Sequence, residues 1–485
     1  MKAWIALIML IIVTMAFAQP PETLWTRTYG WEFISYCDAY AVQRAWGGGF
    51  IVAGSVSNGA LDADFYIVRI DDSGDTLWTR RYGWEVDDEC HDLQRTTDGG
   101  YILAGVCNQN FYSIPHFSDY CLMKMDSAGD TLWSRSYTKY EVNEANAVQQ
   151  TSDGGYILVG SACYPNVCSW FIVKTDSVGD TLWTRIFGNT SYHVAYSVQQ
   201  TTDGGYIIAG VGNTNGAEPS NIYLMKLTES GDLQWERMYG ESSYDYGYSV
   251  QQTTDGGYIV TGRIKYYLAG HDDMFLLKTD SAGDSLWMRI FGGLDHDAGN
   301  SVKQTQDGGY IIAGYTESFG EEQDDYYIVR TDSVGDTLWT NTYGGLDLDQ
   351  ANSISITNDG GYIAAGFSFS FGGNMMYLVR LGTDIPNAVP EESVHMTPMT
   401  AALYPNYPNP FNSNTILTFD ISSPAWTTLA VYNLQGQKVA ELLSTFCQPG
   451  RYTRPFEAGN LASGIYFARL QIAGADQIQK MMFIK

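Results

Sequence analysis

Acidic residues and histidine gather in three short segments, and these are the first features of the chain that could support chemistry. Residues 295–297 read Asp-His-Asp, residues 87–92 hold four more acids around His91 and Cys90, and residues 271–273 read His-Asp-Asp. Oxygen-rich segments suit Ca²⁺, which prefers several carboxylate and carbonyl ligands. None has the ligand spacing of an EF-hand loop. Bound calcium is therefore one interpretation, and a solvated acidic surface is the other.

Aromatic residues recur in the same variable segments and supply the candidate binding residues. An aromatic face beside polar groups suits a sugar ring or an extended peptide. The alternative is ordinary surface composition, because single exposed aromatic residues are common on soluble proteins. The candidates are Trp31, Trp84, Tyr112, Tyr164, Trp170, Tyr192, Tyr244, Tyr246, Tyr266 and His271.

Sequence motifs of several enzyme classes are missing from the chain. There is no Gly-x-Ser-x-Gly, no His-Glu-x-x-His and no glycine-rich phosphate loop. Paired carboxylates of the kind used in glycoside hydrolysis stay open, since any two acids in different loops could face each other. The motifs thus predict no catalytic residue.

These residues are carried by an internal repeat, which indicates the fold. The segment DGGY begins at residues 98, 153, 203, 255, 307 and 359, and a degraded copy, GGGF, occupies 47–50. A second signal, Leu-Trp or its variant Leu-Gln-Trp, recurs in step with it, so seven copies of each are present. The repeated tryptophans are Trp25, Trp78, Trp133, Trp183, Trp235, Trp287 and Trp339.

Each repeat of about 50 residues contains four short strand-like runs, which is typical of a β-propeller blade. In residues 197–240 the runs are SVQQT, GYIIAG, IYLMKL and LQWERMYG. Asp-Gly-Gly and Asp-Ser-x-Gly-Asp separate strands one from two and three from four, and both are turn sequences. The tryptophan lies in the fourth strand, where we expect it to pack between blades.

The phase of the repeat predicts how the ring closes. The chain begins with a fourth-strand sequence, TLWTRTYG at 23–30, and the last repeat ends after its third strand at Leu381. The N-terminal strand should therefore complete the last blade and remove both free edges. We predict an all-β protein with a seven-bladed propeller over residues 19–382.

The two faces of such a propeller differ in sequence. The uniform DGG and DSxGD turns lie on one face. The loops between blades, and those between the second and third strands, lie on the other face and vary strongly. Because function commonly sits on variable loops of a rigid scaffold, we place the candidate site on that second face.

Cysteines allow three pairings in a compartment that permits disulfides. Cys107 and Cys121 flank one loop, and Cys163 and Cys168 flank the matching loop of the next repeat. The third couple, Cys37 and Cys90, occupies equivalent positions in adjacent repeats, which leaves Cys447 over. Buried free thiols are the alternative.

The N-terminus and the charge restrict location and partners. Residues 1–18 read as a signal peptide with an apolar stretch and an Ala-Phe-Ala cleavage sequence. No later segment is apolar enough to span a membrane. A net charge of −27 argues against nucleic acid and anionic membranes as partners.

The C-terminal region differs from the repeats. Residues 383–402 are rich in Pro, Thr and Glu and read as a linker. Short strands and turns over 403–485 predict a small immunoglobulin-like β-sandwich. The motifs YPNPFN at 407–412, VYNLQGQKV at 431–439 and NLASGIYFARL at 460–470 closely resemble the C-terminal sorting domain of type IX secretion substrates. The resemblance implies the type IX machinery as a partner and a secreted or outer-membrane surface location.

The repeats themselves resemble those of large secreted bacterial propellers and, loosely, the tryptophan-docking repeats of quinoprotein propellers. No cofactor-binding set accompanies that second likeness, so we expect no cofactor other than calcium. The sequence favours a non-enzymatic protein that binds a glycan or protein ligand. The alternatives are a polysaccharide hydrolase or lyase and a structural surface-layer component.

Overall fold

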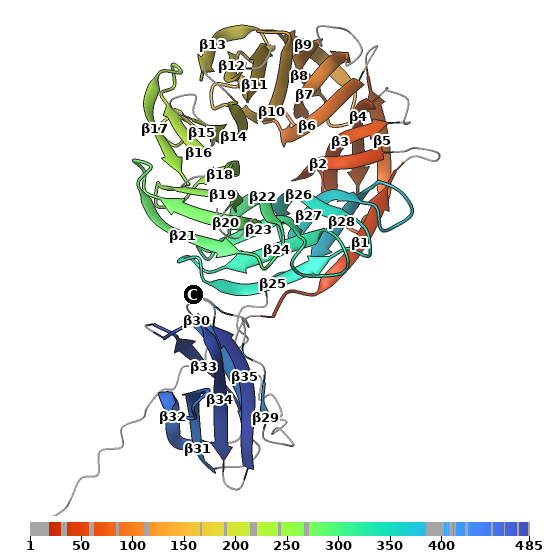
Figure 1. The fold of residues 1–485 in the computed structure, drawn as a ribbon. Coiled ribbons are helices and arrows are strands. Elements are labelled where there is room, and N and C mark those ends of the chain that lie inside the picture. The colour runs from red at the N-terminus through yellow and green to blue at the C-terminus, as the bar shows by residue number, and fades with distance from the viewer. Residues whose placement is uncertain are drawn as a thin grey trace, which may run out of the picture. The chain divides into compact units, whose positions relative to one another are not determined.

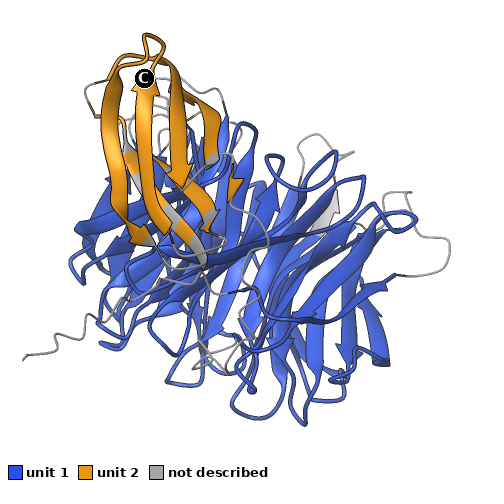
Figure 2. Ribbon diagram, turned by 90° about the horizontal axis from the view of Figure 1, so that it is seen from below, with its two compact units in different colours: residues 1–385 blue, residues 386–485 orange. Residues whose placement is uncertain are grey.

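The structure is a computed structural model, and all its regular elements in the described residues are β-strands. The chain forms two compact units, residues 1–385 and 386–485 (Figure 2). The described residues are 19–30, 36–57, 63–83, 87–110, 117–164, 167–188, 192–213, 221–240, 244–265, 271–384, 402–404, 406, 411, 414–421, 425–447, 450–459, 461–472 and 475–483.

The first unit is a propeller of seven four-stranded antiparallel sheets (Figure 1). Blades 1 to 3, each from inner to outer strand, are β2 (Tyr36–Arg44), β3 (Phe50–Ser57), β4 (Ala63–Ile70), β5 (Thr76–Tyr82); β6 (Asp87–Arg95), β7 (Tyr101–Asn110), β8 (Phe117–Met125), β9 (Thr131–Tyr137); and β10 (Val142–Gln150), β11 (Tyr156–Tyr164), β12 (Val167–Thr175), β13 (Thr181–Phe187).

Blades 4 to 6 repeat the order, and blade 7 takes its outer strand from the N-terminus. They are β14 (Val194–Gln200), β15 (Tyr206–Gly212), β16 (Asn221–Leu227), β17 (Leu233–Tyr239); β18 (Tyr246–Gln252), β19 (Tyr258–Lys265), β20 (Asp272–Thr279), β21 (Ser285–Phe291); β22 (Asp297–Gln304), β23 (Tyr310–Thr316), β24 (Asp325–Thr331), β25 (Thr337–Tyr343); and β26 (Asp349–Ile356), β27 (Tyr362–Ser368), β28 (Met375–Leu381), β1 (Thr23–Tyr29).

Ring closure follows the prediction from the repeat phase. β1 pairs antiparallel with β28, with Thr28 opposite Tyr377. The inner strands β2, β6, β10, β14, β18, β22 and β26 each pack against the inner strand of the next blade, and β26 packs against β2. Figure 1 shows them around the centre of the ring. Every blade therefore has two neighbours and no exposed sheet face.

The hydrophobic core lies between blades, because each sheet is covered on both faces by its neighbours. Second and third strands such as β15 and β16 are buried along nearly their whole length. One cluster joins Ile207 and Leu224 of blade 4 to Val260 and Phe275 of blade 5. Strands buried on both faces read as continuous apolar runs, as the sequences YIIAG and IYLMKL do.

The repeated tryptophan lies between blades, as the sequence indicated. The ring of Trp183 meets Tyr206 of the next blade edge-on, with 6.0 Å between ring centroids. Trp133, Trp235, Trp287 and Trp339 make the same contact with the tyrosine of the following DGGY segment. An equivalent tryptophan in each blade joint is therefore part of the scaffold.

Inner strands begin earlier than the sequence indicated. In blade 4 the first strand was expected at 197, but β14 begins at Val194. A β-bulge at Tyr196 interrupts the two-residue alternation. The last residues of the segments assigned to blade-to-blade loops therefore belong to inner strands.

The second unit is a small β-sandwich. One sheet contains β29 (Ala402–Leu403), β30 (Asn414–Ile421) and β33 (Gly450–Glu457). The other contains β32 (Lys438–Cys447), β31 (Ala425–Asn433), β34 (Gly464–Ile472) and β35 (Ala475–Phe483). Leu417, Leu429, Phe456 and Ala468 lie in the core between them.

Candidate functional site at the mouth of the channel

The seven inner strands each carry a β-bulge at the same position. The side chains two and four residues before the bulge share its side of the strand, because side chains alternate along a strand. They therefore form successive rings around the axis of the propeller toward the face that carries the variable loops. The end of these rings on that face, lined by the residues two and four before each bulge, is the channel mouth. The bulged residues are Tyr40, His91, Asn146, Tyr196, Tyr248, Asn300 and Asn352.

Asparagine or histidine at the bulge position links blades 2, 3, 6 and 7 each to the next blade. The side-chain amides of Asn146, Asn300 and Asn352 donate to the carbonyl oxygens of Ala195, Ala351 and Ala39, each at 2.9 Å. The Nδ1 atom of His91 lies 2.9 Å from the carbonyl oxygen of Ala145. These polar bulge residues complete the scaffold.

Tyrosine occupies the bulge position in blades 4 and 5 and creates an aromatic cluster. The ring of Tyr248 stacks on Tyr246, with 5.8 Å between centroids, and meets Tyr196 edge-on at 5.1 Å. The guanidinium of Arg263 lies over Tyr246, 4.3 Å from the ring centroid. Tyr192, which hydrogen-bonds to Tyr196, is 44% exposed. The cluster thus presents aromatic faces and a cation to solvent.

An acidic cluster occupies blades 1 to 3 of the same rings. Two residues before the bulge, the inner strands carry Asp38, Glu89 and Glu144. The Nε2 atom of His91 lies 3.3 Å from Glu89 Oε2, and Asn374 donates to Asp38 Oδ1 at 2.8 Å. Asp38 and Glu144 thus lie on the inner strands on either side of β6, which carries Glu89 and His91, close enough for their charges to interact with Glu89.

Their environments move the pKa values of these carboxyl groups in opposite directions. The hydrogen bond from His91 is the largest effect on Glu89 and lowers its pKa despite burial. Burial raises the pKa of Asp38 and of Glu144, and the charge of Glu89 adds to both. For His91, burial lowers the pKa, but the hydrogen bond and charge of Glu89 outweigh it and the pKa is raised. Glu89 therefore stays ionised more readily than its two neighbours.

A pocket of about 310 Å³ opens beside the acidic cluster, at the edge of blades 1 and 2. The side chain of Glu89 is 36% exposed, so a ligand can reach it. The pocket combines carboxyl groups, hydroxyl groups and two tyrosine rings. Its described lining residues are Tyr36, Asp38, Tyr40, Ser55, Ser57, Ala63, Asp87 and Glu89.

Four of the ten candidate binding residues lie outside the described residues, namely Trp31, Trp84, Tyr112 and Tyr266. Tyr192, Tyr244 and Tyr246 lie at the channel mouth with the aromatic cluster. Tyr164 is exposed but lies at the end of β11, where its ring faces Tyr140 at 6.2 Å. His271 meets His296 edge-on at 5.3 Å, at the joint of blades 5 and 6.

Trp170 is not a surface residue, so its assignment as a ligand-binding residue was wrong. It lies within β12, is fully buried and donates from Nε1 to the carbonyl oxygen of Val211 at 3.1 Å. The segment read as a loop ends before it, because the hairpin between β11 and β12 is short. Sequence reasoning missed Arg263, near the end of β19, and Glu144, which precedes the bulge of β10 and so lies before the part of the inner strand that the sequence predicted.

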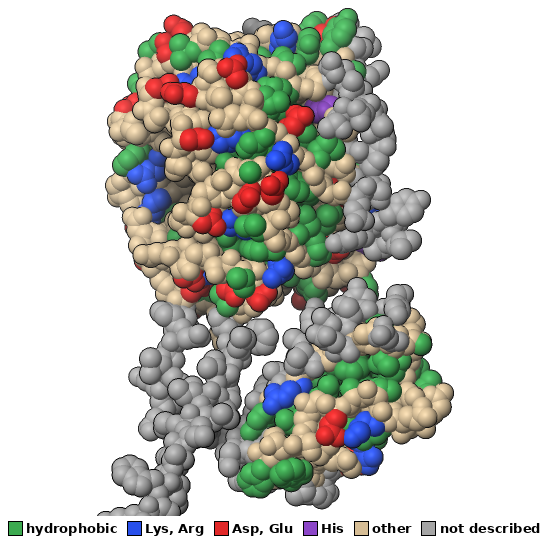
Figure 3. Space-filling model, turned by 90° about the vertical axis from the view of Figure 1, so that its left-hand side faces the viewer, with side chains coloured by type: hydrophobic (Ala, Val, Ile, Leu, Met, Phe, Trp, Pro, Cys, Tyr) green, Lys and Arg blue, Asp and Glu red, His purple; other side chains and the backbone are tan. Residues whose placement is uncertain are grey.

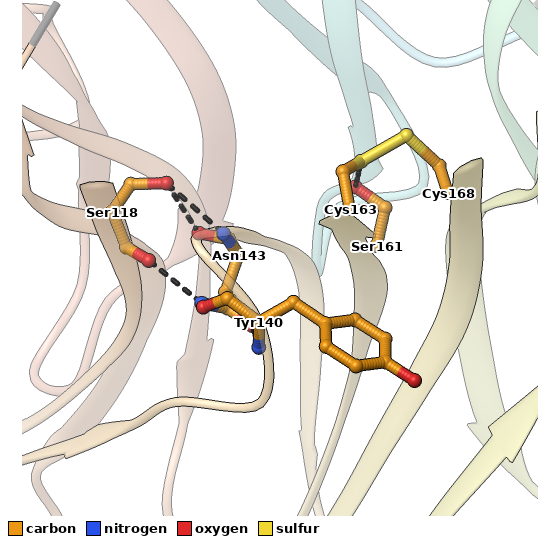
Figure 4. Close-up of a disulfide and its surroundings, with 6 residues drawn as sticks. All are labelled: Ser118, Tyr140, Asn143, Ser161, Cys163 and Cys168. Carbon is orange, nitrogen blue, oxygen red and sulfur yellow. Dashed lines mark hydrogen bonds between the residues drawn. A yellow bond between two sulfur atoms is a disulfide. The ribbon is translucent and has the colours of Figure 1, made fainter. Parts of the chain in front are cut away.

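One of the three expected cysteine pairs is present as a disulfide. Cys163 and Cys168 join the ends of β11 and β12 (Figure 4). Cys37, Cys90, Cys107 and Cys121 are buried free thiols, so the other two pairings are not formed in this structure, although the thiols of Cys107 and Cys121 lie in hydrogen-bond contact. Cys37 and Cys90 pack in different clusters of the core, which keeps those two thiols apart. The side chain of Cys447 is not among those described.

No group of three or more His, Cys, Asp or Glu side chains in the described residues is arranged to hold a metal ion. None of the described elements is a helix long and apolar enough to cross a membrane. Figure 3 shows acidic and basic side chains interspersed over one face of the propeller. The candidate site at the mouth is thus distinguished by its aromatic and acidic clusters rather than by a metal centre.

Comparison with known proteins identifies the second unit. Residues 406–485 match the family described as the secretion system C-terminal sorting domain. This part of the chain is a type IX sorting domain. It marks the protein as a substrate of the type IX secretion machinery, which delivers it to the extracellular space or the cell surface.

A curated relative matches a limited part of the chain. It is the Regulatory protein FlaEY of Caulobacter vibrioides, which is 30% identical over 134 residues. The match covers 25% of this chain and 14% of FlaEY. The chain thus spans a small fraction of that relative's length.

Solved structures similar to this chain have low sequence identity to it, and one of them is described as a β-propeller domain. A fungal alcohol oxidase of the AA5 family in complex with copper has a TM-score of 0.47 at 10% identity, covering 96% of this chain and 100% of its own. A PL25 ulvan lyase also scores 0.47 at 10%, covering 74% and 96%. The β-propeller domain of the Trilobed protease from Pyrococcus furiosus scores 0.41 at 12%, covering 72% and 93%. These likenesses carry no argument about activity.

Proposed function

We propose that this secreted propeller binds a carbohydrate at its channel mouth, between the aromatic cluster and the acidic cluster. The observation that carries the proposal is the tyrosine group of blades 4 and 5, with Tyr192 and Tyr244 exposed at 44% and 48%. Tyrosine faces stack on the apolar face of a sugar ring, and the polar edge of the ring needs hydrogen-bonding groups nearby. Glu89 and Asp38 on the inner strands, and Arg263 of β19 over Tyr246, provide such groups.

The residues that hold the blades together differ from those of the candidate site, and this separation favours a role in ligand recognition. The repeated tryptophans and the polar bulge residues are used in blade contacts, whereas the mouth tyrosines break the repeat pattern. Residues that depart from a structural repeat on one face are typical of a binding surface on a rigid scaffold.

A glycan array probed with the mature chain, residues 19–485, tests the proposal. Tyr192→Ala and Tyr244→Ala should each weaken binding about fivefold or more, as expected for an aromatic contact residue. Tyr164→Ala is the matched control, since Tyr164 is exposed at 56% but lies away from the mouth. A blank array, or equal losses in all three variants, would contradict recognition at the mouth. The chain would then be better described as a surface-layer component or a binder of protein.

Glycan cleavage is a second candidate, favoured by the opposite pKa shifts in the acidic cluster. Glycoside hydrolysis needs one carboxyl group that keeps its proton and one that is ionised. Glu144, whose pKa is raised, would act as the acid, and Glu89, whose pKa is lowered, as the base or nucleophile. Raised and lowered pKa values in one accessible cluster are features of active sites.

Incubation of a bound glycan with the protein, followed by mass spectrometry of the products, separates the two candidates. Cleavage would shorten the glycan, and Glu144→Gln and Glu89→Gln should abolish the product while binding is retained. An intact glycan after prolonged incubation between pH 4 and 8 would leave recognition as the function. Loss of binding in both variants, with no product from the unaltered protein, would assign the acids to recognition.

A further inference from the structure

Two blade joints in the propeller each bring a pair of aspartates together. At the joint of blades 5 and 6, Asp273 Oδ1 and Asp297 Oδ2 lie 2.3 and 2.5 Å from the point where a Cβ on Gly292 would sit. At the joint of blades 6 and 7, Asp325 Oδ1 and Asp349 Oδ2 lie 2.0 and 2.5 Å from the same point on Gly344. The two oxygens of each pair are thus within about 5 Å of each other.

The two joints share one local structure. Asp297 Oδ2 accepts hydrogen bonds from Gly293 N at 3.0 Å and Ser318 Oγ at 2.7 Å. Asp349 Oδ2 accepts the same two bonds from Gly345 N and Ser370 Oγ, both at 2.8 Å. The segments GGLDHD at 292–297 and GGLDLD at 344–349 encode this repetition. The carboxylates are therefore held in place by the chain around them.

One oxygen of each inner-strand aspartate has no partner. Asp297 and Asp349 are fully buried, and their Oδ1 atoms have no hydrogen-bond donor among the described residues. A buried carboxylate oxygen without a donor is costly, and a second carboxylate beside it increases that cost. Each inner-strand carboxylate thus has one oxygen, Oδ2, beside the second carboxylate and another, Oδ1, without a donor, and a proton or a cation would offset both.

The joint of blades 1 and 2 shows what the chain does when it supplies its own cation. There, Arg81 forms an ion pair with the buried Asp64. Asp64 has the same position in the third strand of its blade as Asp273 and Asp325 have in theirs. Arg81 lies opposite Tyr66, two residues after Asp64. At the joint of blades 5 and 6, the position of Arg81 is held by Ile290, opposite Phe275. At the joint of blades 6 and 7, it is held by Thr342, opposite Tyr327. Neither side chain carries a charge, and the basic group that acts on Asp273 is His296, whose Nδ1 lies 3.8 Å from Asp272 Oδ2.

We propose that each of these two joints binds one Ca²⁺ ion, which takes the place that the Arg81 guanidinium has in the first joint. Calcium accepts six to eight oxygen ligands at about 2.3–2.6 Å, so two carboxylate oxygens within about 5 Å can share one ion. Backbone carbonyl groups and water would complete the coordination. The ions would lock blades 5, 6 and 7 together on the face that carries the channel mouth.

Calorimetric titration and thermal unfolding of the mature chain test this site. After chelation with EDTA and dialysis, added Ca²⁺ should bind with a stoichiometry of two and raise Tm by about 3 °C or more at saturation. Asp297→Asn and Asp349→Asn should each remove one of the two binding events. The double variant should show none.

Arginine substitutions keep the proposal falsifiable if the asparagine variants fail to fold. Ile290→Arg and Thr342→Arg recreate the Arg81 arrangement, so each should remove one calcium-binding event without lowering Tm in EDTA. Ile186→Arg is the matched control, because Ile186 has the same register opposite Phe171 in a joint without an aspartate pair. It should leave both binding events intact. Unchanged Tm and no binding heat in the unaltered protein, or calcium binding that persists in both arginine variants, would overturn the proposal.

Discussion

The indole ring of Trp183 covers Gly231 of the next blade, and one of its carbons lies 2.8 Å from the point that a Cβ on this glycine would occupy. Gly231 has a φ of 79°, in the left-handed region that favours glycine. Trp133, Trp235 and Trp287 cover Gly179, Gly283 and Gly335 in the same way. The tryptophan and the Asp-Ser-x-Gly-Asp turn therefore recur together because each blade's tryptophan packs on the turn of its neighbour.

Gly231→Ala should destabilise the propeller through both effects. The unfavourable φ costs about 1–2 kcal/mol for a residue with a Cβ, and the contact with Trp183 adds about 1–3 kcal/mol of overpacking. Urea unfolding measures the sum. Gly154→Ala is the control, since Gly154 has a φ of 84° but no atom within 4 Å of its added Cβ. Equal losses in the two variants would show that the tryptophan yields without cost.

Acid should weaken the propeller through the aspartates of the DGG turns. Lys226 Nζ, nearly buried, lies 2.9 Å from Asp203 Oδ2. The same pair recurs in blades 2, 3 and 5, and an arginine takes the place of the lysine in blades 6 and 7. Burial raises the pKa of Asp203, but hydrogen bonds from Thr201, Lys226 and Gly205 outweigh it, and the pKa is lowered to about 2. A lowered folded-state pKa stabilises the fold above the unfolded pKa of 3.8. That contribution is lost as pH falls toward 2, because the folded protein must then take up the proton.

Asp203→Asn isolates this pair. At pH 7 it should lower the free energy of unfolding by about 1–2 kcal/mol, less than for a fully buried pair because Asp203 is half exposed. At pH 2, close to the folded-state pKa of Asp203, most of this difference should be lost. Urea titrations at the two pH values make the comparison. A loss that is as large at pH 2 as at pH 7 would assign the effect to the turn and not to the ion pair.

Removal of the disulfide should cost modest stability. Cys163 and Cys168 are five residues apart, and closure of so short a loop corresponds to about 2 kcal/mol in the chain-entropy estimate. The double variant Cys163→Ser/Cys168→Ser should therefore unfold at lower urea than the oxidised protein. Dithiothreitol should lower the stability of the unaltered protein by a similar amount and leave the double variant unchanged. A response of the double variant to the reductant would point to another disulfide.

Secretion should depend on the C-terminal unit. In a bacterium with the type IX machinery, deletion of residues 406–485 should leave the propeller inside the outer membrane, since the sorting domain lies in that segment. Immunoblots of periplasmic and extracellular fractions measure this. A variant with alanine in place of four tyrosines at the channel mouth, Tyr192, Tyr244, Tyr246 and Tyr248, should be secreted as the unaltered protein is. Retention of that variant would indicate a folding defect.

Local chemistry explains why so much of the fold could be predicted. Turn glycines, apolar runs and the spacing of DGGY and Leu-Trp are properties of single segments, and seven repeats of them permit few arrangements. The start of β14 at Val194 was missed because the bulge at Tyr196 breaks the alternation on which strand prediction depends. The burial of Trp170 was missed because it was assigned to a loop, whereas β11 and β12 are joined by a short hairpin and Trp170 lies within β12.

The sequence by itself determined the exported sorting unit, the number of blades and the closure of the ring, because each depends on motifs and on their order along the chain. Only the tertiary structure decided which residues share the channel mouth. Glu89 and Glu144 are 55 positions apart, and they become neighbours because successive inner strands pack side by side. The same packing joins Asp273 to Asp297 and Asp325 to Asp349. Their charges interact through space, and a sequence pattern within one blade contains no information on which side chain of the next blade lies opposite.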